Sequence, residues 1–446
     1  MFKSMTDGSP TRSIIGFALP ILIGNIFQQF YNMADTIIVG NTLGSQALAG
    51  VGSTGTISFL FFGLISGMCV GFTVVTAQKF GANDLEGMRK TVGSAVILSA
   101  VITVVMTAVT VIGMRPLLII MNTQDSFFDQ AYDYIIVISA GLFAQVIYNL
   151  LAAVLRALGN SRAPLVFLII SALLNIVLDI WFIVGIGMGT EGAAYATVIS
   201  QLVSSVLCFI YIVKMVPLLH LKKEDFIPDR RLMLNQIRLG CPMALQFSVT
   251  ALGSMILQSA LNPFGHLAVA GYTAASKIEQ IGTQAYVACG TTMATYCAQN
   301  TGAKQYYRIR RGFRSIMVMA VIYTVVIGPI FYLFGKYMTV LFVKEDISLI
   351  MPYADMYIKN SSLFLLPLSV VIIFRNGLQG IGYALMPFLG GVAELGARWA
   401  VAMIGAAQES YHIICLASPF AWVAAAVLLI VVYIVVVRNP KYHKPA

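Results

Sequence analysis

Long, uninterrupted apolar runs recur along this chain, and they restrict its fold more than any other feature. Residues 92–113 and 422–437 form two of these runs. An α-helix needs about 20 apolar residues to cross the hydrocarbon core of a bilayer. A transmembrane β-barrel would instead show strands of about ten residues in which polar and apolar side chains alternate. The runs do not alternate, so they predict an all-α membrane protein.

The low proportion of charged residues supports the same class. Only 10% of the 446 residues are charged and 59% are hydrophobic, whereas a soluble domain carries about 25% charged residues. The run at 14–39 is too long for the apolar core of a cleaved signal peptide, so we interpret it as the first membrane helix. The sequence predicts twelve transmembrane helices, at 14–39, 46–77, 91–113, 131–155, 164–186, 191–213, 236–261, 267–298, 314–335, 353–378, 383–407 and 412–437.

The net charge of +10 is distributed unevenly along the chain. Of the 28 Lys and Arg residues, 21 fall near the two termini, in the segment 214–238 and in loops that the predicted spans place on the same side. An excess of Lys and Arg marks the cytoplasmic side of a membrane. We therefore expect a multi-pass protein of the plasma (inner) membrane with both termini in the cytoplasm. This bias explains the net positive charge, so we expect no nucleic acid partner. We also expect the protein to be a monomer in the lipid bilayer.

The chain repeats itself at an interval of about 222 residues. Pro20 corresponds to Pro242, and the motif Ala-Gln-x-x-Gly-Ala occurs at 77–82 and again at 298–303. Each half has six predicted spans, an even number, so both halves insert the same way up. We expect two pseudo-symmetric six-helix bundles: an N-terminal lobe at 1–214, a cytoplasmic linker at 215–235 and a C-terminal lobe at 236–446. Two such halves are typical of alternating-access carriers and fit the symmetric ring of a channel less well.

Polar side chains follow one face of two matching spans. The first span carries a stripe in steps of three and four, which comprises Asn25, Gln28, Asn32 and Asp35. The seventh span carries a stripe without an acid, which comprises Gln246, Thr250, Ser254, Gln258 and Asn262. Such spacing places side chains on one helix face. Interhelical hydrogen bonds explain a single Asn or Gln, but complete stripes favour the lining of a cavity. Glu279 in the eighth span is a further candidate for that lining.

Two aspartates lie within predicted spans of the first half, with no Lys or Arg near them on the same span. Asp35 belongs to the first span, and Asp179 follows Asn175 by one turn in the fifth. A carboxylate in a low dielectric without a basic partner takes up a proton or binds a cation. Such a group suits the coupling of transport to an ion gradient; the alternative is a neutral, hydrogen-bonded structural acid. Glu394 differs, because Arg398 follows one turn later and predicts an ion pair.

Taken together, these residues resemble the multidrug and toxic compound extrusion (MATE) family. The resemblance covers nearly the whole chain. It rests on Pro20, Tyr-Asn-Met-Ala-Asp-Thr at 31–36, Arg-Ala-Leu-Gly-Asn at 156–160, Asn-x-x-x-Asp at 175–179 and Gly-Ala-Ala-Tyr-Ala-Thr at 192–197. It implies a MATE-like fold with a cation or proton site in the N-terminal lobe, formed by Asp35, Asn175, Asp179 and Thr197, with Tyr31 in the same polar network.

The resemblance also implies that the first helix bends at Pro20 during transport. A proline removes a helix hydrogen bond, so a hinge is chemically reasonable there. Two carboxylates with Asn and Thr oxygens suit Na⁺, and the same pair can share a proton, so the sequence leaves the coupling ion as Na⁺ or H⁺. The acids that another branch of the family places in helices 7 and 10 are missing here, which removes support for coupling through the C-terminal lobe.

These observations predict a secondary active multidrug exporter of small organic, typically cationic substrates. It would antiport them against Na⁺ or H⁺ by alternating access of two lobes, with no cofactor besides the coupling ion. The alternative is a lipid or polyprenyl-linked sugar flippase of the same superfamily. A flippase needs a strongly cationic cavity, for which the spans offer Lys277, Arg375 and Arg398.

An enzyme is not expected. The chain has no H-E-x-x-H, G-x-S-x-G or P-loop motif, and its six cysteines have no zinc-site spacing. An intramembrane aspartyl protease would need Gly-x-Gly-Asp at its second acid, where this chain has Ile-Val-Leu-Asp at 176–179.

Overall fold

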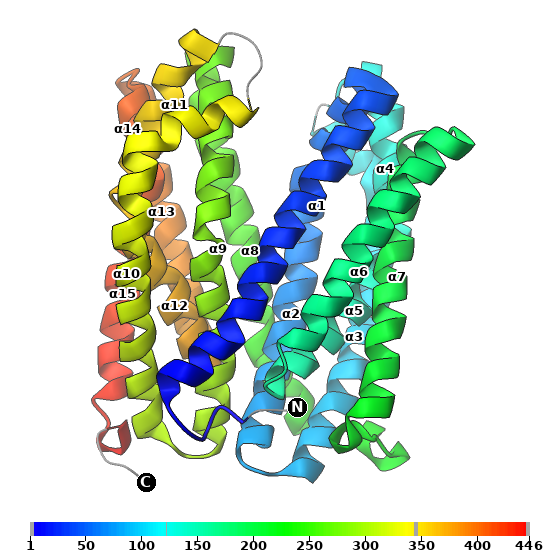
Figure 1. Ribbon diagram of the computed structural model, residues 1–446, viewed down its shortest axis with the longest axis vertical. Helices are drawn as coiled ribbons and strands as arrows, with labels where there is room; N and C mark the ends of the chain where they lie inside the picture. The colour runs from blue at the N-terminus through cyan, green and yellow to red at the C-terminus, as the bar shows by residue number, and fades with distance from the viewer. Residues whose placement is uncertain (1–3, 122, 343–346, 443–446) are drawn as a thin grey trace. The chain divides into compact units, whose positions relative to one another are not determined.

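The computed structural model describes residues 4–121, 123–342 and 347–442, and all regular secondary structure in these ranges is helical (Figure 1). Contacts within the chain define two compact units. The first unit contains Leu19–Phe247, and the second contains Met5–Ala18 together with Ser248–Ala446. Two long helices, α1 (Pro10–Ser53) and α8 (Arg230–Leu261), therefore contribute residues to both units.

The first unit takes its remaining structure from the helices between α1 and α8. These are α2 (Gly55–Gly81), α3 (Leu85–Ile120), η1 (Asp125–Phe127), α4 (Phe128–Ala140), α5 (Leu142–Ala157), α6 (Arg162–Asp179), η2 (Ile180–Ile186), α7 (Thr190–Met215), η3 (Pro217–Leu219) and η4 (Lys223–Phe226). The helix α2 packs against α3 and α5, and α7 packs against α4, α5 and α6. A core cluster among these helices includes Phe72, Met88, Leu155 and Cys208, each at most 1% exposed.

The second unit follows the same plan after α8. Its elements are η5 (Asn262–Phe264), α9 (His266–Gly302), α10 (Tyr306–Thr339), η6 (Val340–Phe342), α11 (Ile347–Ser362), α12 (Leu365–Ile381), α13 (Leu385–Ala407), α14 (Tyr411–Cys415), α15 (Ala417–Val437) and η7 (Pro440–Tyr442). The helix α9 packs against α10, α11 and α12, and α15 packs against α12 and α13.

Backbone geometry reproduces the repeat that the sequence shows. Residues with positive φ occur in matched pairs along the two halves: Gly44 and Gly265, Asn83 and Lys304, Gly159 and Gly382, and Gly187 and Glu409. Each pair is separated by 221 to 223 positions. Positive φ is unfavourable for residues other than glycine. Asn83, Lys304 and Glu409 therefore adopt it because the duplicated turns require it.

The helices agree with the predicted spans, with two bends that the sequence did not predict. In the described ranges, nine helices are long and apolar enough to cross a membrane, and two bent pairs bring the number to eleven. The pairs are α4 with α5, bent by 49°, and α11 with α12, bent by 55°; they fall in the predicted spans 131–155 and 353–378. The remaining predicted span, 267–298, is α9. Its 37 residues measure about 55 Å, but they are more polar than the helices that meet the criteria for a membrane span.

Many large apolar side chains face outward, as a membrane protein requires. Ile112 is 79% exposed, Val104 is 69% exposed and Val325 is 67% exposed. In water this exposure would be unfavourable, but lipid chains can cover it. The apolar helices and their apolar outer surface identify a multi-pass membrane protein.

The beginning of α1 is held by hydrogen bonds within the second unit. The Met5 N–H donates to Gln299 Oε1 at 2.8 Å, and Asn300 Nδ2 donates to the Met5 carbonyl at 3.2 Å. Arg308 donates to the Gly8 carbonyl at 2.9 Å. In the first unit, Gln236 near the start of α8 donates to two backbone carbonyls of α2 and α3. The predicted lobe boundaries at 215–235 rest on the sequence repeat and remain a prediction.

Candidate ion-coupling site

The helix α1 contributes two polar side chains that the sequence assigned to the site. Tyr31 and Asp35 are four residues apart, so they lie on one face of α1, and both side chains are partly buried. The Tyr31 hydroxyl interacts with the side chain of Thr197 from α7. This contact joins α1 to α7 within the first unit.

The helix α6 supplies the second carboxyl group at its last residue. Asp179 and Asn175 are both 0% exposed, and they share one face because they are one turn apart. The chain continues from Asp179 as the π-helical turn η2. Such turns are rare and frequently occur at functional sites, because they displace the side chains beside them. The turn ends at Ile186, and the next residue, Gly187, has a φ of 80° that suits glycine.

The Asn175 amide connects Asp179 with Thr197. In the orientation that satisfies both amide atoms, its nitrogen donates to Asp179 Oδ2 at 3.1 Å and its oxygen accepts from the Thr197 N–H at 3.2 Å. The Thr197 hydroxyl lies 3.4 Å from the same amide. The structure thus brings together the four residues that the resemblance assigned to one site, with Tyr31 beside them.

The two carboxyl groups meet directly. Asp35 and Asp179 lie within hydrogen-bonding reach of each other. The Oδ1 atom of each is buried and has no hydrogen-bond partner in the part of the chain that the structure describes. No ion pair found among the described residues includes either acid. Two acids in contact away from water need a proton between them or a cation beside them.

The donor set fits a hard monovalent cation as well as a proton. Hard cations prefer oxygen ligands. The Oδ1 atoms of Asp35 and Asp179 and the Thr197 hydroxyl are ligands of this kind. A group of three or more His, Cys, Asp or Glu side chains, as many transition-metal sites have, does not occur in the described residues. The identity of the coupling ion, Na⁺ or H⁺, remains a prediction.

Tyr134 of α4 is a site residue that the sequence analysis missed. It interacts electrostatically with Asp35, Tyr31 and Asp179, and its ring packs against the apolar cluster that contains Val39. The fourth span has no polar stripe or motif that would single out this tyrosine. Its position beside the acids depends on how α4 packs against α7.

The remaining residues of the first polar stripe are not part of this cluster. Asn25 is partly buried, and its Nδ2 has no partner among the described residues. Gln28 and Asn32 are exposed. Their assignment to a cavity wall remains a prediction. Pro20 is buried within α1, one residue after the point where α1 passes from the second unit to the first.

The polar residues predicted in the second half make contacts of their own. Gln258 of α8 donates to Asn262 of η5 at 2.9 Å, while Gln246 and Thr250 are partly buried and engaged in polar contacts. Glu279 of α9 interacts with the side chains of Tyr357 and Ser361 in α11. The cavity-lining role of these residues remains a prediction.

The predicted ion pair of Glu394 with Arg398 is confirmed, and a second arginine, Arg375, also pairs with Glu394. Arg398 Nη2 lies 2.8 Å from Glu394 Oε1, and Arg375 Nη2 of α12 lies 2.7 Å from Glu394 Oε2. All three side chains are nearly buried, between 8% and 12% exposed. The helical spacing of Glu394 and Arg398 predicts the first pair, whereas Arg375 comes from another helix and carries no local signal.

Structural comparison defines the class of this fold. A solved MATE structure in complex with MaL6 superposes on the chain with a TM-score of 0.92 at 23% identity, over 98% of both chains. The fold is therefore that of a duplicated, all-helical membrane transporter. The MatE family model matches residues 20–181 and again residues 242–404, once in each half. The chain belongs to the MatE family, whose members are membrane transporters and not enzymes.

Two relatives extend over most of the chain. The "Probable multidrug resistance protein YpnP" of Bacillus subtilis is 28% identical over 386 residues, which cover 86% of this chain and 85% of the relative. The "Probable multidrug resistance protein NorM" of Thermotoga maritima is 25% identical over 382 residues, which cover 85% and 82%. Both matches agree with the resemblance drawn from the motifs.

Proposed function

We propose that this protein is a secondary active multidrug exporter that exchanges small organic, cationic substrates for Na⁺ or H⁺. The observation that carries the proposal is the contact between Asp35 and Asp179, two acids without a basic partner among the described residues. The names of the relatives as multidrug resistance proteins support the substrate class. The basic bias of one set of loops supports cytoplasmic termini.

Ion binding at the acid pair would provide the coupling. An ion that enters from outside neutralises Asp35 and Asp179 and so weakens the hold of the cavity on a cationic substrate, which leaves. The loaded carrier then turns inward, releases the ion and accepts new substrate. A ligand shifts such an equilibrium only through different affinities for the two states. A membrane potential of 100 mV contributes about 2.3 kcal/mol per charge, roughly a fiftyfold bias.

Asn175, Thr197 and Tyr31 would position the acids and stabilise the ion-bound state. Asn175 holds the Asp179 carboxyl and the backbone of α7 through one amide. Tyr31 interacts with Thr197 and so links α1 to α7. A rearrangement of α1 would break these contacts together with the contact between the acids. A bend in α1 would break the fewest backbone hydrogen bonds at Pro20, because proline has no N–H to donate.

Vesicle transport tests this proposal. We would reconstitute the protein in vesicles, load a fluorescent organic cation and impose Na⁺ and pH gradients separately. Asp35→Asn and Asp179→Asn should each reduce gradient-driven export at least tenfold, because an amide neither binds Na⁺ as a carboxylate does nor releases a proton. The control is Asp133→Asn, an exposed acid of α4, which should export normally. Full activity of both site variants at normal membrane insertion would refute the coupling role.

The flippase alternative finds less support. Its cationic cavity would have to use Arg375 and Arg398, but Glu394 neutralises both in a nearly buried cluster. Lys277, the third candidate, is exposed and lies over the ring of Phe342 at 5.7 Å. We therefore retain the exporter as the proposed function.

A further inference from the structure

A polar socket in the second unit holds the segment Met5–Gly8, which precedes α1. The socket lies where α9 ends and α10 begins, and it comprises Gln299, Asn300 and Arg308. Gln299 and Asn300 are 0% exposed, so the segment reaches side chains that belong to the packed interior of this unit. The ion-exchange proposal assigns no role to this contact.

Arg308 holds the segment through three of its backbone carbonyls. The guanidinium donates to the carbonyls of Met5 at 3.2 Å, Asp7 at 3.3 Å and Gly8 at 2.9 Å. The Nε atom of the same side chain donates to Asn300 Oδ1 at 3.0 Å. A guanidinium presents its donors in a fixed planar fork, so this set of bonds determines the path of the segment as well as its place.

Met5 is buried and has both of its backbone polar groups paired. It is 2% exposed, and its N–H donates to Gln299 Oε1 at 2.8 Å. Its carbonyl accepts from Asn300 Nδ2 and from Arg308, each at 3.2 Å. Opening this contact would bring an apolar side chain into water. It would also break hydrogen bonds from a charged donor, which are stronger than those between neutral groups. Both effects favour the closed contact.

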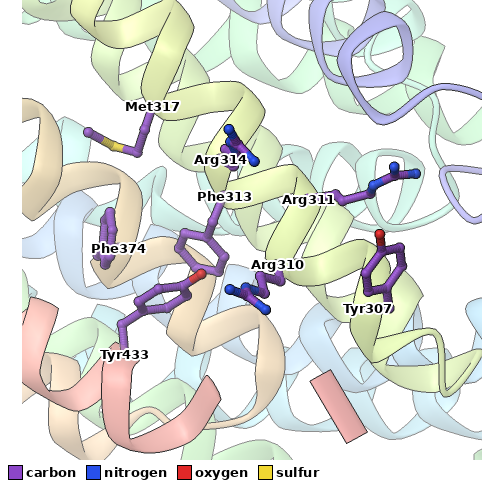
Figure 2. A pocket seen from close by; sticks show the side chains of 8 residues that line it. All are labelled: Tyr307, Arg310, Arg311, Phe313, Arg314, Met317, Phe374 and Tyr433. Carbon is purple, nitrogen blue, oxygen red and sulfur yellow. The ribbon is translucent and has the colours of Figure 1, made fainter. Parts of the chain in front are cut away.

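The start of α10, which carries Arg308, is itself held firmly in the second unit. The Tyr296 hydroxyl of α9 donates to the Arg308 carbonyl at 2.9 Å. Further along α10, Figure 2 shows Phe313 beside Phe374 of α12 and Tyr433 of α15. The centroid of the Phe313 ring lies 5.1 Å from that of Phe374 and 4.6 Å from that of Tyr433. The socket is therefore built on helices that are packed together.

The first turns of α1 continue this attachment. The hydroxyl oxygens of Thr11 and Ser315 lie 2.7 Å apart and share a hydrogen bond. The second unit includes α1 as far as Ala18, and the first unit begins at Leu19. Pro20 follows at once, and a proline removes a backbone hydrogen bond from a helix. The backbone of α1 is thus interrupted directly after the part that the second unit holds.

The segment before α8 is also docked, and its place is in the first unit. Residues 227–230 correspond to residues 5–8 at the interval of 222 positions that separates the two prolines, and they belong to the first unit. Asp225 packs so closely on α3 that a Cβ added at Gly93 would lie 2.1 Å from its carbonyl oxygen. Gln236 donates to backbone carbonyls of α2 and α3 at 3.2 and 2.8 Å. The repeat therefore docks this segment twice, each time in the unit that the following helix then leaves.

We propose that Met5–Gly8 and its socket form a clasp that stays closed throughout transport, so that the first turns of α1 move with the second unit. Every change in α1 is then confined to the residues after Ala18. The inference rests on the alternating access proposed above, and it adds which part of α1 belongs to which moving body. A clasp that opened in each cycle would instead have to expose Met5 and break the bonds of Arg308 every time.

Weakening the clasp should impair transport by the full-length protein in the vesicle assay described above. Arg308→Gln removes the charged donor of three bonds and should lower export of the organic cation by about fivefold or more. The matched control is Arg311→Gln, an exposed arginine of the same helix that lies 5.0 Å from the centre of the Tyr307 ring. This control should export normally. Equal export by the two variants would overturn the role of the clasp in transport.

A disulfide that locks the clasp provides a second test, which stands even if Arg308→Gln does not fold. The side-chain oxygens of Thr11 and Ser315 lie 2.7 Å apart, so the variant T11C/S315C places two thiols within reach of a disulfide. The oxidised variant should export within about twofold of its reduced form, because a lock on a contact that is closed in every state favours none of them. The single variants T11C and S315C, oxidised in the same way, control for the native cysteines.

The disulfide test has outcomes that would overturn the proposal. Export that falls by about fivefold or more on oxidation and returns with a reducing agent would mean that the clasp has to open. Failure of T11C/S315C to cross-link would contradict the clasp itself. The rate of cross-linking in detergent should agree within about twofold between Na⁺ and K⁺ buffers, and a larger difference would also overturn the proposal. Because this rate requires no transport, wild-type protein that exports nothing while the rate stays constant would count against the exporter function and not against the clasp.

Discussion

Replacing Glu394 with glutamine removes the negative charge that two nearly buried arginines share. Arg375 and Arg398 contact its two carboxylate oxygens at 2.7 and 2.8 Å, and the three side chains are only 8% to 12% exposed. An amide keeps a single acceptor oxygen and presents an N–H group to the other arginine. Both guanidinium groups then lose their anionic partner in a place with little water.

The expected loss of stability is large. Removing one member of a buried ion pair costs about 3–5 kcal/mol, because the remaining charge stays buried and uncompensated. For a unit of this size, each kcal/mol lowers the unfolding midpoint by about 2–4 °C. The midpoint of the second unit should therefore fall by about 6 °C or more in Glu394→Gln.

Thermal unfolding in detergent micelles, followed with a thiol-reactive fluorophore, measures this effect. Cys297 and Cys415 are buried in the second unit and become reactive when it unfolds. The matched control is Glu86→Gln, which breaks an exposed pair with Lys90. Water and salt screen an exposed pair, which therefore contributes little to stability, so this midpoint should change little. If Glu394→Gln unfolds no earlier than Glu86→Gln, the stabilising role of the buried cluster is refuted.

Two further predictions concern the first unit, and the same unfolding assay checks both through its buried Cys69 and Cys208. Gly71→Ala should destabilise this unit by about 1–3 kcal/mol, because the new Cβ would lie 2.3 Å from the Gly240 Cα. Gly113→Ala, which meets nothing within 4 Å, should have no such effect, and equal midpoints would contradict the packing argument. Asp84→Ala should cost about 1 kcal/mol at pH 7, because Asp84 caps the α3 N-terminus. The Lys79 side chain beside Asp84 lowers the pKa of that carboxyl, so its contribution is complete above the unfolded-state pKa and declines as the pH falls through the lowered folded-state value. An Asp84→Ala effect of equal size at pH 7 and pH 3 would contradict this assignment.

The fold could be predicted largely from the sequence because its determinants are local. Each apolar run is long enough to require a membrane helix, and the repeated motifs fix two halves of six spans. The bend at Gly141 between α4 and α5 and the bend between Ser362 and Leu365 were not predictable, because the apolar runs continue through both. Such bends result from how neighbouring helices pack, which a hydrophobic run does not encode.

The candidate site could be predicted only where a helix face or a family motif carries the information. The spacing of Asn175 and Asp179 places both on one face of α6, and that arrangement is confirmed. The contact between Asp35 and Asp179 joins helices that are far apart in the sequence, and the resemblance was what brought them together. Tyr134 and Arg375 were missed for the same reason, since each contacts its partners across helices and has no signal along its own.

The division of α1 and α8 between the two units has a consequence for any attempt to split the chain. A cut near residue 228 gives two fragments, each of which keeps a segment that belongs to the other. The first fragment retains Met5–Ala18, the partner of Gln299 and Arg308. The second fragment retains the start of α8, including Gln236, which caps carbonyls of α2 and α3. Neither fragment is then a complete folding unit. Co-expression becomes a complementation experiment, in which the first fragment supplies Met5–Ala18 and the second supplies the start of α8.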